Sequence, residues 1–404
     1  MPHPPRLSQR AHAMPASPIR RLAPFAAEAR RAGKKVYSLN IGQPDIPTPK
    51  EILDRLRSYD ERNVPYGPSQ GLPEFIEALR GYYARVGLTV ATEEIFVTTG
   101  GSEAILFVLG ALADDGDEVV VFEPFYTNYS GFASLIGVKL VPVTTRAEDG
   151  YHLPPREAIE AKIGPKTRAI LVCTPNNPTG TVYTDEEMER LGAICRERGL
   201  FLVCDEVYRE FAYDGRRQRS CLTLLGIEDR VVMVDSLSKR VSLCGIRVGN
   251  IVSRNRELMA AILKFGQARL CPPTLGQFAA CALGDVPPSY IEGVIRDYQR
   301  RRDVVYEALT TAPGVTVRKP EGAFYLCVKL PIDDAERFAI FMLRDFAVDG
   351  ETVMVAPADG FYATPGLGRD EVRIAYVLEE TKLVRAMAIF DAALRAYPGK
   401  AVTV

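Results

Sequence analysis

The sequence predicts an α/β fold in which a mainly parallel sheet is covered by helices. From about residue 94, short apolar runs rich in β-branched residues alternate with longer segments of helical period. Strands that are apolar at every position are buried on both faces, which is typical of a parallel sheet between helices. The chain has 404 residues, of which 47% are hydrophobic and 25% charged, so it is large enough for two domains around a substantial core.

The individual elements follow from local patterns. The expected strands are residues 95–98, 118–122, 169–173, 201–204 and 231–234. Thr184 and Glu187 have the spacing of a capping box, so we expect a helix to begin at Asp185. After Pro287-Pro288, a long charged run over 289–309 predicts another helix. We expect a large domain over 46–288 and a smaller domain formed by 1–45 together with 289–404.

Composition argues against several classes of function. The 50 basic and 51 acidic side chains give a net charge of −1 without long runs of either sign, so no nucleic-acid partner is expected. No segment approaches about 18 uninterrupted apolar residues, so no membrane partner is expected either. The eight cysteines lack a C-x-x-C pair and favour reduced thiols in a cytoplasmic protein. The Pro- and Arg-rich start is interpreted as a frayed tail, with a transit peptide as the alternative.

Candidate site residues follow the expected strands, because ligands of open α/β sheets bind at the carboxyl ends of the strands. In chain order they are Gly101, Ser102, Tyr126, Asn177, Asp205, Tyr208, Ser236, Lys239 and Arg247. Each has a plain structural explanation when taken alone: a tight turn, a core aromatic, a solvated lysine. Together they offer an anion-binding helix start, a stacking ring, an amide, a carboxylate with a phenol, and a lysine with an arginine. This combination matches the groups of pyridoxal 5′-phosphate.

Seven motifs in chain order resemble those of one enzyme family. They are IGQPD at 41–45, YGPSQGLP at 66–73, NNPTG at 176–180, DEVY at 205–208, SLSK at 236–239, RVG at 247–249 and RIAY at 373–376. The chain is thereby similar to the pyridoxal-phosphate-dependent aminotransferases of the aspartate aminotransferase superfamily, fold type I, class I/II. The resemblance runs from about Leu7 to the C-terminus. It implies a mainly parallel seven-stranded sheet in the large domain and a smaller α+β domain.

The resemblance also implies roles for the residues around the cofactor. Lys239 would hold it as an internal aldimine and then, as a neutral amine, move the proton from the substrate α-carbon in ping-pong half-reactions. Asp205 would keep the ring nitrogen protonated, and Tyr208 and Asn177 would bind the phenolic oxygen. Gly101, Ser102, Ser236 and Arg247 would hold the phosphate, while Tyr126 would stack on the ring. Tyr66 resembles a residue that reaches the phosphate across a dimer, which implies a homodimer with shared active sites.

The substrate is expected to be an L-amino acid, with the aspartate or glutamate type favoured, and a 2-oxo acid is expected as the acceptor. Arg373 would bind the α-carboxylate as a fork, with the Gly42 backbone and Asn177 opposite. An aspartate or glutamate substrate needs a second cation, for which Arg269 is the candidate, although a surface arginine before Pro272-Pro273 explains it equally well. Without such a cation, aromatic, branched-chain or alanine substrates become more plausible.

The same motifs leave other functions open. A carbon–sulfur β-lyase uses the same core residues. A non-enzymatic regulator that binds pyridoxal phosphate would carry an added DNA-binding segment, and no helix-turn-helix pattern precedes the domain. A dehydrogenase would need G-x-G-x-x-G after the first strand, which is absent. No metal is expected, because the only histidines are His3, His12 and His152.

Overall fold

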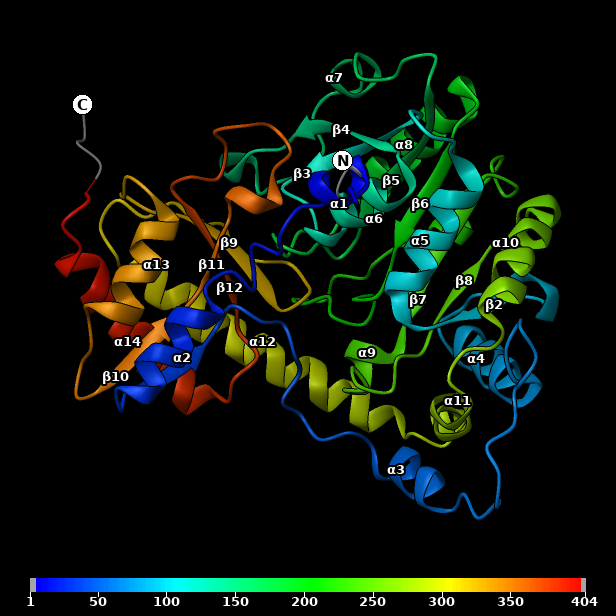
Figure 1. The fold of residues 1–404 in the computed structure, drawn as a ribbon, viewed down its shortest axis with the longest axis horizontal. Helices are drawn as coiled ribbons and strands as arrows, with labels where there is room; N and C mark the ends of the chain where they lie inside the picture. The colour runs from blue at the N-terminus through cyan, green and yellow to red at the C-terminus, as the bar shows by residue number, and fades with distance from the viewer. Residues whose placement is uncertain (1–4, 401–404) are drawn as a thin grey trace.

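The computed structural model describes residues 5–400, which form two lobes (Figure 1). The larger lobe contains a seven-stranded sheet in the order β2-β8-β7-β6-β5-β3-β4. Its strands are β2 (Ile95–Thr98), β3 (Glu118–Glu123), β4 (Lys139–Thr144), β5 (Thr167–Cys173), β6 (Phe201–Asp205), β7 (Val231–Ser236) and β8 (Gly249–Val252). All neighbours from β7 to β4 are parallel, whereas β8 is antiparallel to β7 and β2. The predicted α/β fold with a mainly parallel sheet is therefore confirmed.

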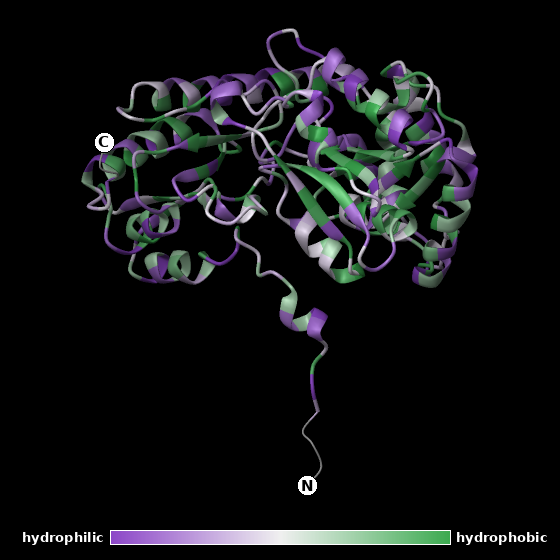
Figure 2. Cartoon of the chain, turned by 90° about the horizontal axis from the view of Figure 1, so that it is seen from above, coloured by the Kyte–Doolittle hydropathy of each residue, from purple (hydrophilic) through white to green (hydrophobic). Residues whose placement is uncertain are grey.

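Helices cover both faces of this sheet. Buried side chains of α5, α6 and α10 pack on one face, and those of α4, α8 and α11 pack on the other. Figure 2 shows the strands of the sheet as continuously hydrophobic, in agreement with burial from both sides. The helices are α1 (Gln9–Ala13), α2 (Ala23–Arg31), α3 (Lys50–Arg57), α4 (Pro73–Arg85), α5 (Gly100–Leu112), α6 (Asn128–Ile136), α7 (Arg156–Glu160), α8 (Asp185–Arg198), α9 (Leu237–Arg240), α10 (Arg256–Arg269), α11 (Thr274–Ala280), α12 (Pro288–Thr310), α13 (Ala335–Arg344) and α14 (Glu380–Ala396).

The smaller lobe is built on two small sheets. β1 (Lys35–Ser38) pairs in parallel with β10 (Glu351–Met354). β12 (Glu371–Ala375) pairs antiparallel with β9 (Tyr325–Lys329) and with β11 (Ala356–Pro357). Buried residues of α2, α12, α13 and α14 join β1, β9, β10 and β12 in one hydrophobic core. This is the expected smaller α+β unit, and segments from both ends of the chain meet in it.

Two local helix predictions are confirmed. The Thr184 hydroxyl accepts from the Glu187 amide at 3.2 Å while Glu187 Oε2 accepts from the Thr184 amide at 2.7 Å, which is the predicted capping box of α8. The run over 289–309 lies within α12. All eight cysteines are free. In the part of the chain that the structure describes, no helix has the length and apolar character needed to cross a membrane. The domain boundaries stay a prediction, and α1 packs beside α6 of the larger lobe.

Candidate active site

The sheet topology brings the predicted site residues together at one edge. Asp205 is the last residue of β6, and Ser236 is the last residue of β7. Because β8 runs in the opposite direction, its beginning lies at this same edge, where Ser236 pairs with Gly249 just after Arg247. Lys239 follows on the short helix α9, whose N-cap hydroxyl on Ser236 accepts from the Ser238 amide at 3.1 Å.

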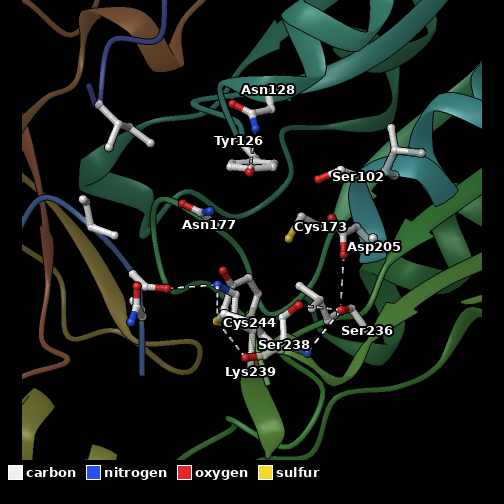
Figure 3. Close-up of a pocket in the computed structure, with 18 of the residues that line it drawn as sticks. Ser102, Tyr126, Asn128, Cys173, Asn177, Asp205, Ser236, Ser238, Lys239 and Cys244 are labelled. Atoms are coloured by element: carbon white, nitrogen blue, oxygen red, sulfur yellow. Dashed lines mark hydrogen bonds between the residues drawn. The ribbon is translucent and has the colours of Figure 1, made fainter. Parts of the chain in front are cut away.

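A cavity of about 500 Å³ lies at this edge and extends to the smaller lobe (Figure 3). The predicted site residues that line it are Gly42, Gly101, Ser102, Tyr126, Asn177, Asp205, Tyr208, Ser236, Lys239, Arg247 and Arg373. The structure thus brings together all but two of the predicted residues, although their individual roles stay predictions. Tyr126 and Asn177 lie across the cavity from Lys239.

Lys239 projects its amine into the cavity without a carboxylate partner. Nζ donates to the Gly42 carbonyl oxygen at 2.9 Å and lies 3.9 Å from Cys244 Sγ. No acidic side chain among residues 5–400 forms a salt bridge with it. The amine is therefore held at the junction of the lobes by neutral contacts, which suits a group that has to change its bonding during a reaction.

Asp205 is a buried carboxylate without a cationic partner. Tyr129 Oη donates to Oδ2 at 2.8 Å, and the Val207 amide donates to Oδ1 at 3.3 Å. Burial raises the pKa of Asp205 to about 6, although the two hydrogen bonds act in the opposite direction. A cationic or N–H group of a ligand that reaches this carboxylate stabilises its ionised form further.

Arg373 is a buried guanidinium that likewise lacks an ion pair within the described chain. It is 1% exposed on β12 and lies between the rings of Tyr325 and Phe361, 4.5 and 4.9 Å from their centroids. Nη1 donates to Asn177 Oδ1 at 3.0 Å, Nη2 donates to the Asn40 carbonyl, and Nε has no partner. A buried charge of this kind needs an anion, and the fork of the guanidinium fits a carboxylate.

Arg247 and the start of α5 form the opposite end of the cavity. Arg247 Nη1 donates to the Cys244 carbonyl at 3.0 Å, and the side chain packs against Gly100. A Cβ on Gly100 would lie 2.6 Å from Arg247 Nη2, and Gly100 has a φ of +73°. Glycine is required there because it permits both the backbone conformation and the close approach of the arginine. The α5 amides and Arg247 together offer a candidate anion site.

The sequence profile of the family described as "Aminotransferase class I and II" matches residues 34–389, most of the chain. The chain belongs to this family. An aspartate/prephenate aminotransferase of Thermus thermophilus is 32% identical over 390 residues, which cover 95% of this chain and 97% of that protein. An aspartate aminotransferase of Geobacillus stearothermophilus is 29% identical, with coverages of 92% and 94%. An alanine aminotransferase structure from Pyrococcus furiosus superposes with a TM-score of 0.88 at 30% identity, covering 97% of this chain and all of that one.

Aminotransferases of this family use pyridoxal 5′-phosphate, and the present residues fit that group. The unpaired Asp205 carboxylate meets the need of a protonated ring nitrogen, and the anion site formed by Arg247 and α5 meets the need of a phosphate. Tyr126 offers a ring whose hydroxyl is held by Asn128 Nδ2 at 2.8 Å. Burial raises the pKa of Tyr126 to about 12, so this hydroxyl stays neutral at physiological pH.

Two predicted residues of this aminotransferase lie outside the cavity of their own chain. Arg269 contacts Glu103 Oε1 at 3.6 Å and the carbonyl oxygens of Ser69 and Val97 at 3.4 and 3.3 Å. Tyr66 is 81% exposed, so its hydroxyl is free to contact another subunit. Neither side chain lines the cavity of its own chain, so the roles expected for Arg269 and Tyr66 stay predictions.

Other cavity residues were missed by sequence reasoning. Tyr325 Oη lies 2.9 Å from Tyr208 Oη, and a Cβ on Gly42 would lie 1.7 Å from Tyr325 Oη. The sequence shows Tyr325 only as part of a turn, and nothing in that pattern indicates a contact with residue 42. Cys244 and Arg20 also line the cavity. Their local sequence carries no motif of its own, so only the tertiary structure reveals them.

Proposed function

We propose that this aminotransferase moves the amino group of an acidic L-amino acid, of the aspartate or glutamate type, to a 2-oxo acid at the cavity described above. The observation that carries the proposal is the set of unpaired charges on Lys239, Asp205, Arg247 and Arg373 around one cavity. The aspartate aminotransferases among the relatives support an acidic substrate. Bound in the cavity, pyridoxal 5′-phosphate supplies a ring that accepts the electrons of the substrate α-carbon.

Different residues of the chain would bind different groups of the cofactor. Lys239 Nζ would hold the cofactor, and as a neutral amine it would take the proton from the substrate α-carbon. Asp205 holds a proton on the ring nitrogen, and Tyr126 orients the ring by stacking. Asn177 and Tyr208 donate hydrogen bonds to the phenolic oxygen. The phosphate is held by Gly101, Ser102, Ser236 and Arg247.

The substrate is oriented from the smaller lobe. Arg373 binds the α-carboxylate through two N–H groups, and the Gly42 backbone closes the opposite side. Because Arg373 lies on β12 whereas Asn177 belongs to the larger lobe, the hydrogen bond between them places the α-carboxylate site at the junction of the two lobes. The second half-reaction reverses the first with a different 2-oxo acid and uses the same residues.

We infer that the active unit is a homodimer in which Tyr66 of one subunit contacts the phosphate bound by the other. The exposure of Tyr66 and its place in the YGPSQGLP motif support this. The eight free cysteines support a cytoplasmic location. Sedimentation equilibrium of wild type and Tyr66→Phe tests the dimer: both variants should be dimeric, and Tyr66→Phe should bind the cofactor about 10-fold more weakly. A monomer that binds the cofactor normally would contradict the inference.

The visible absorption spectrum of the purified protein tests the main proposal. We expect a band from the lysine-bound cofactor that bleaches with aspartate or glutamate and returns with a 2-oxo acid. Lys239→Ala should lack this band, and Lys239→Arg is the matched control because it retains the positive charge without a transferable proton. If only alanine or an aromatic amino acid bleaches the band, the proposal of an acidic substrate is wrong. Release of pyruvate and sulfide from cysteine would instead indicate a β-lyase.

A further inference from the structure

The segment of residues 17–21 forms part of the cavity wall. Ser17, Ile19 and Arg20 line the cavity, and Asn40 Nδ2 donates to the Ile19 carbonyl oxygen at 3.3 Å. Arg21 fixes the segment to the smaller lobe, because its guanidinium contacts Glu336 at 2.9 Å and Asp359 at 2.6 Å. The backbone of this segment is therefore anchored on both sides of Arg20.

Arg20 itself has no such anchor. Its side chain is exposed at the mouth of the cavity and forms no salt bridge or side-chain hydrogen bond with any of residues 5–400. The neighbouring Arg21 is paired with two carboxylates, which shows that acidic groups are available to this segment and that Arg20 is not directed toward them. An anchored backbone that presents an unpaired cation to a cavity is suited to binding an anionic ligand.

The charges of the cavity leave one cation without a partner when the cofactor and an α-amino acid are bound. The basic residues that line it are Arg20, Lys239, Arg247 and Arg373, and Asp205 is the sole acidic residue lining it among those described. Under the proposed function, Asp205 pairs with the ring nitrogen, Arg247 with the phosphate, Lys239 with the cofactor and Arg373 with the α-carboxylate. Arg20 then remains for a second anionic group on the substrate.

Asn40 connects the two substrate-facing cations. Its carbonyl oxygen accepts from Arg373 Nη2, and its side-chain amide donates to the Ile19 carbonyl next to Arg20. Asn40 is 2% exposed, so this connection is held in the protein interior. The α-carboxylate site and the wall that carries Arg20 are therefore built on the same residue, on one side of the cavity.

We propose that Arg20 binds the distal carboxylate of a dicarboxylic substrate and determines specificity for it. This inference rests on the proposed function and assigns to Arg20 the role that the sequence suggested for Arg269. The Arg269 guanidinium already contacts Glu103 and lies outside the cavity of its own chain, whereas Arg20 faces the cavity in the same chain that supplies Arg373. In this proposal, Arg20 at the mouth of the cavity recognises the negative charge of the substrate side chain. The interior of the cavity binds the groups that all α-amino acids share.

The test compares substrates that differ only in the distal charge. For wild type and Arg20→Gln, kcat/KM is measured with glutamate and glutamine and with aspartate and asparagine. We expect Arg20→Gln to lower kcat/KM about 5- to 30-fold for the two acids and less than about twofold for the two amides. Arg20→Lys should restore part of the loss because it retains the charge. Arg31→Gln, an exposed arginine on α2 away from the cavity, is the matched control.

A binding measurement separates recognition from turnover. Calorimetry is carried out with succinate and butyrate, which differ in one carboxylate. Arg20→Gln should weaken the binding of succinate and leave the binding of butyrate unchanged. Equal losses for acids and amides would overturn the proposal, as would a selective loss in Arg269→Gln but not in Arg20→Gln. If the wild-type cofactor band bleaches with neutral amino acids but not with acidic ones, the protein is still a transaminase, but the role proposed for Arg20 is wrong. If no amino acid bleaches it, the proposed function itself fails, and this inference fails with it.

Discussion

Arg373 Nη1 donates a hydrogen bond to Asn177 Oδ1 at 3.0 Å, which joins the smaller lobe to the loop after β5 at the centre of the cavity. Arg373 is also enclosed by the rings of Tyr325 and Phe361, so its planar fork is held in one orientation. The amide of Asn177 is neutral and leaves the charge of the guanidinium uncompensated. An incoming carboxylate therefore supplies the strongest interaction available to Arg373.

Replacing Arg373 by lysine should keep the charge but remove the fork. We expect kcat/KM for every amino acid to fall by about 100-fold, because a buried two-point contact with a carboxylate is reduced to a single hydrogen bond. Steady-state kinetics with an acidic and a neutral amino acid measure this effect. The cofactor band should keep its wild-type intensity, which serves as the control for folding. A loss restricted to acidic substrates would contradict the assignment of Arg373 to the α-carboxylate.

Asp205 should destabilise the cofactor-free protein at neutral pH. Burial raises its pKa to about 6 from an ordinary value of 3.8, so the folded state binds this proton more tightly than the unfolded state does. Protonated Asp205 therefore contributes to the stability of the fold below about pH 4, and this contribution is lost as the pH rises through about 6. Asp205→Asn has no charge to bury, so its free energy of unfolding should exceed that of the wild type by about 1–3 kcal/mol above pH 6.

Denaturant titrations at pH 4 and pH 7.5, with and without pyridoxal phosphate, measure this effect. The two cofactor-free proteins should have equal stability at pH 4. With the cofactor the order at pH 7.5 should reverse, because only the wild type gains an ion pair with the ring nitrogen. A wild type that is the more stable protein at pH 7.5 without cofactor would contradict this account.

The strand ends were predictable because they depend on local patterns. Continuous apolar runs place Asp205 and Ser236 at the ends of buried strands, and a polar residue at that position has few structural uses. Strand β4 was missed because Pro142 interrupts its sequence. The structure shows why proline is tolerated: β4 is an edge strand that pairs only with β3, so the missing N–H is not needed by a second neighbour.

The contacts between distant segments were not predictable. Tyr325 meets Tyr208 of the larger lobe and also Gly42, and the Ile19 carbonyl beside Arg20 accepts from Asn40; these contacts join segments distant in the sequence and follow no local period. Arg269 shows the limit of charge alone: the sequence offers it as the cation for a distal carboxylate, whereas in its own chain the guanidinium contacts Glu103, so that role stays a prediction. A cation in a sequence indicates available charge, and only the tertiary structure shows whether an acid already compensates it.

His152 should stabilise the fold in a pH-dependent manner. Nδ1 lies 2.9 Å from Glu187 on α8, and Nε2 lies 3.4 Å from Glu321, which precedes β9 of the smaller lobe. Hydrogen bonds to these two carboxylates raise the pKa of His152 to about 9 from 6.5. Its stabilisation is complete below about pH 6.5 and is lost as the pH rises through about 9.

Replacement of His152 by glutamine should therefore cost about 1–2 kcal/mol of unfolding free energy at pH 6 and almost nothing at pH 9.5. This cost is smaller than the full pKa shift would give, because solvent screens a side chain that is 29% exposed. Parallel denaturant titrations across this range measure the difference between the two proteins. A difference that grows with pH would show that His152 is held neutral.

Gly100 should be required for cofactor binding in a way that another glycine of similar conformation is not. Gly100 and Gly116 have φ values of +73° and +84°, so alanine strains the backbone at both. Only at Gly100 would the new Cβ meet Arg247, at 2.6 Å from Nη2, whereas nothing lies within 4 Å at Gly116. Each variant should lose about 1–2 kcal/mol of stability, but Gly100→Ala alone should displace the guanidinium from the phosphate site.

Equilibrium dialysis with pyridoxal 5′-phosphate measures this difference. We expect Gly100→Ala to raise the Kd about 10- to 100-fold, because a charge-assisted contact with the phosphate is lost, and Gly116→Ala to leave it within about twofold of wild type. Arg247→Gln should reproduce the effect of Gly100→Ala, and the double variant should bind no more weakly than either single one, since both substitutions remove the same contact. Additive losses would show that Gly100 acts on the cofactor through its own amide rather than through Arg247.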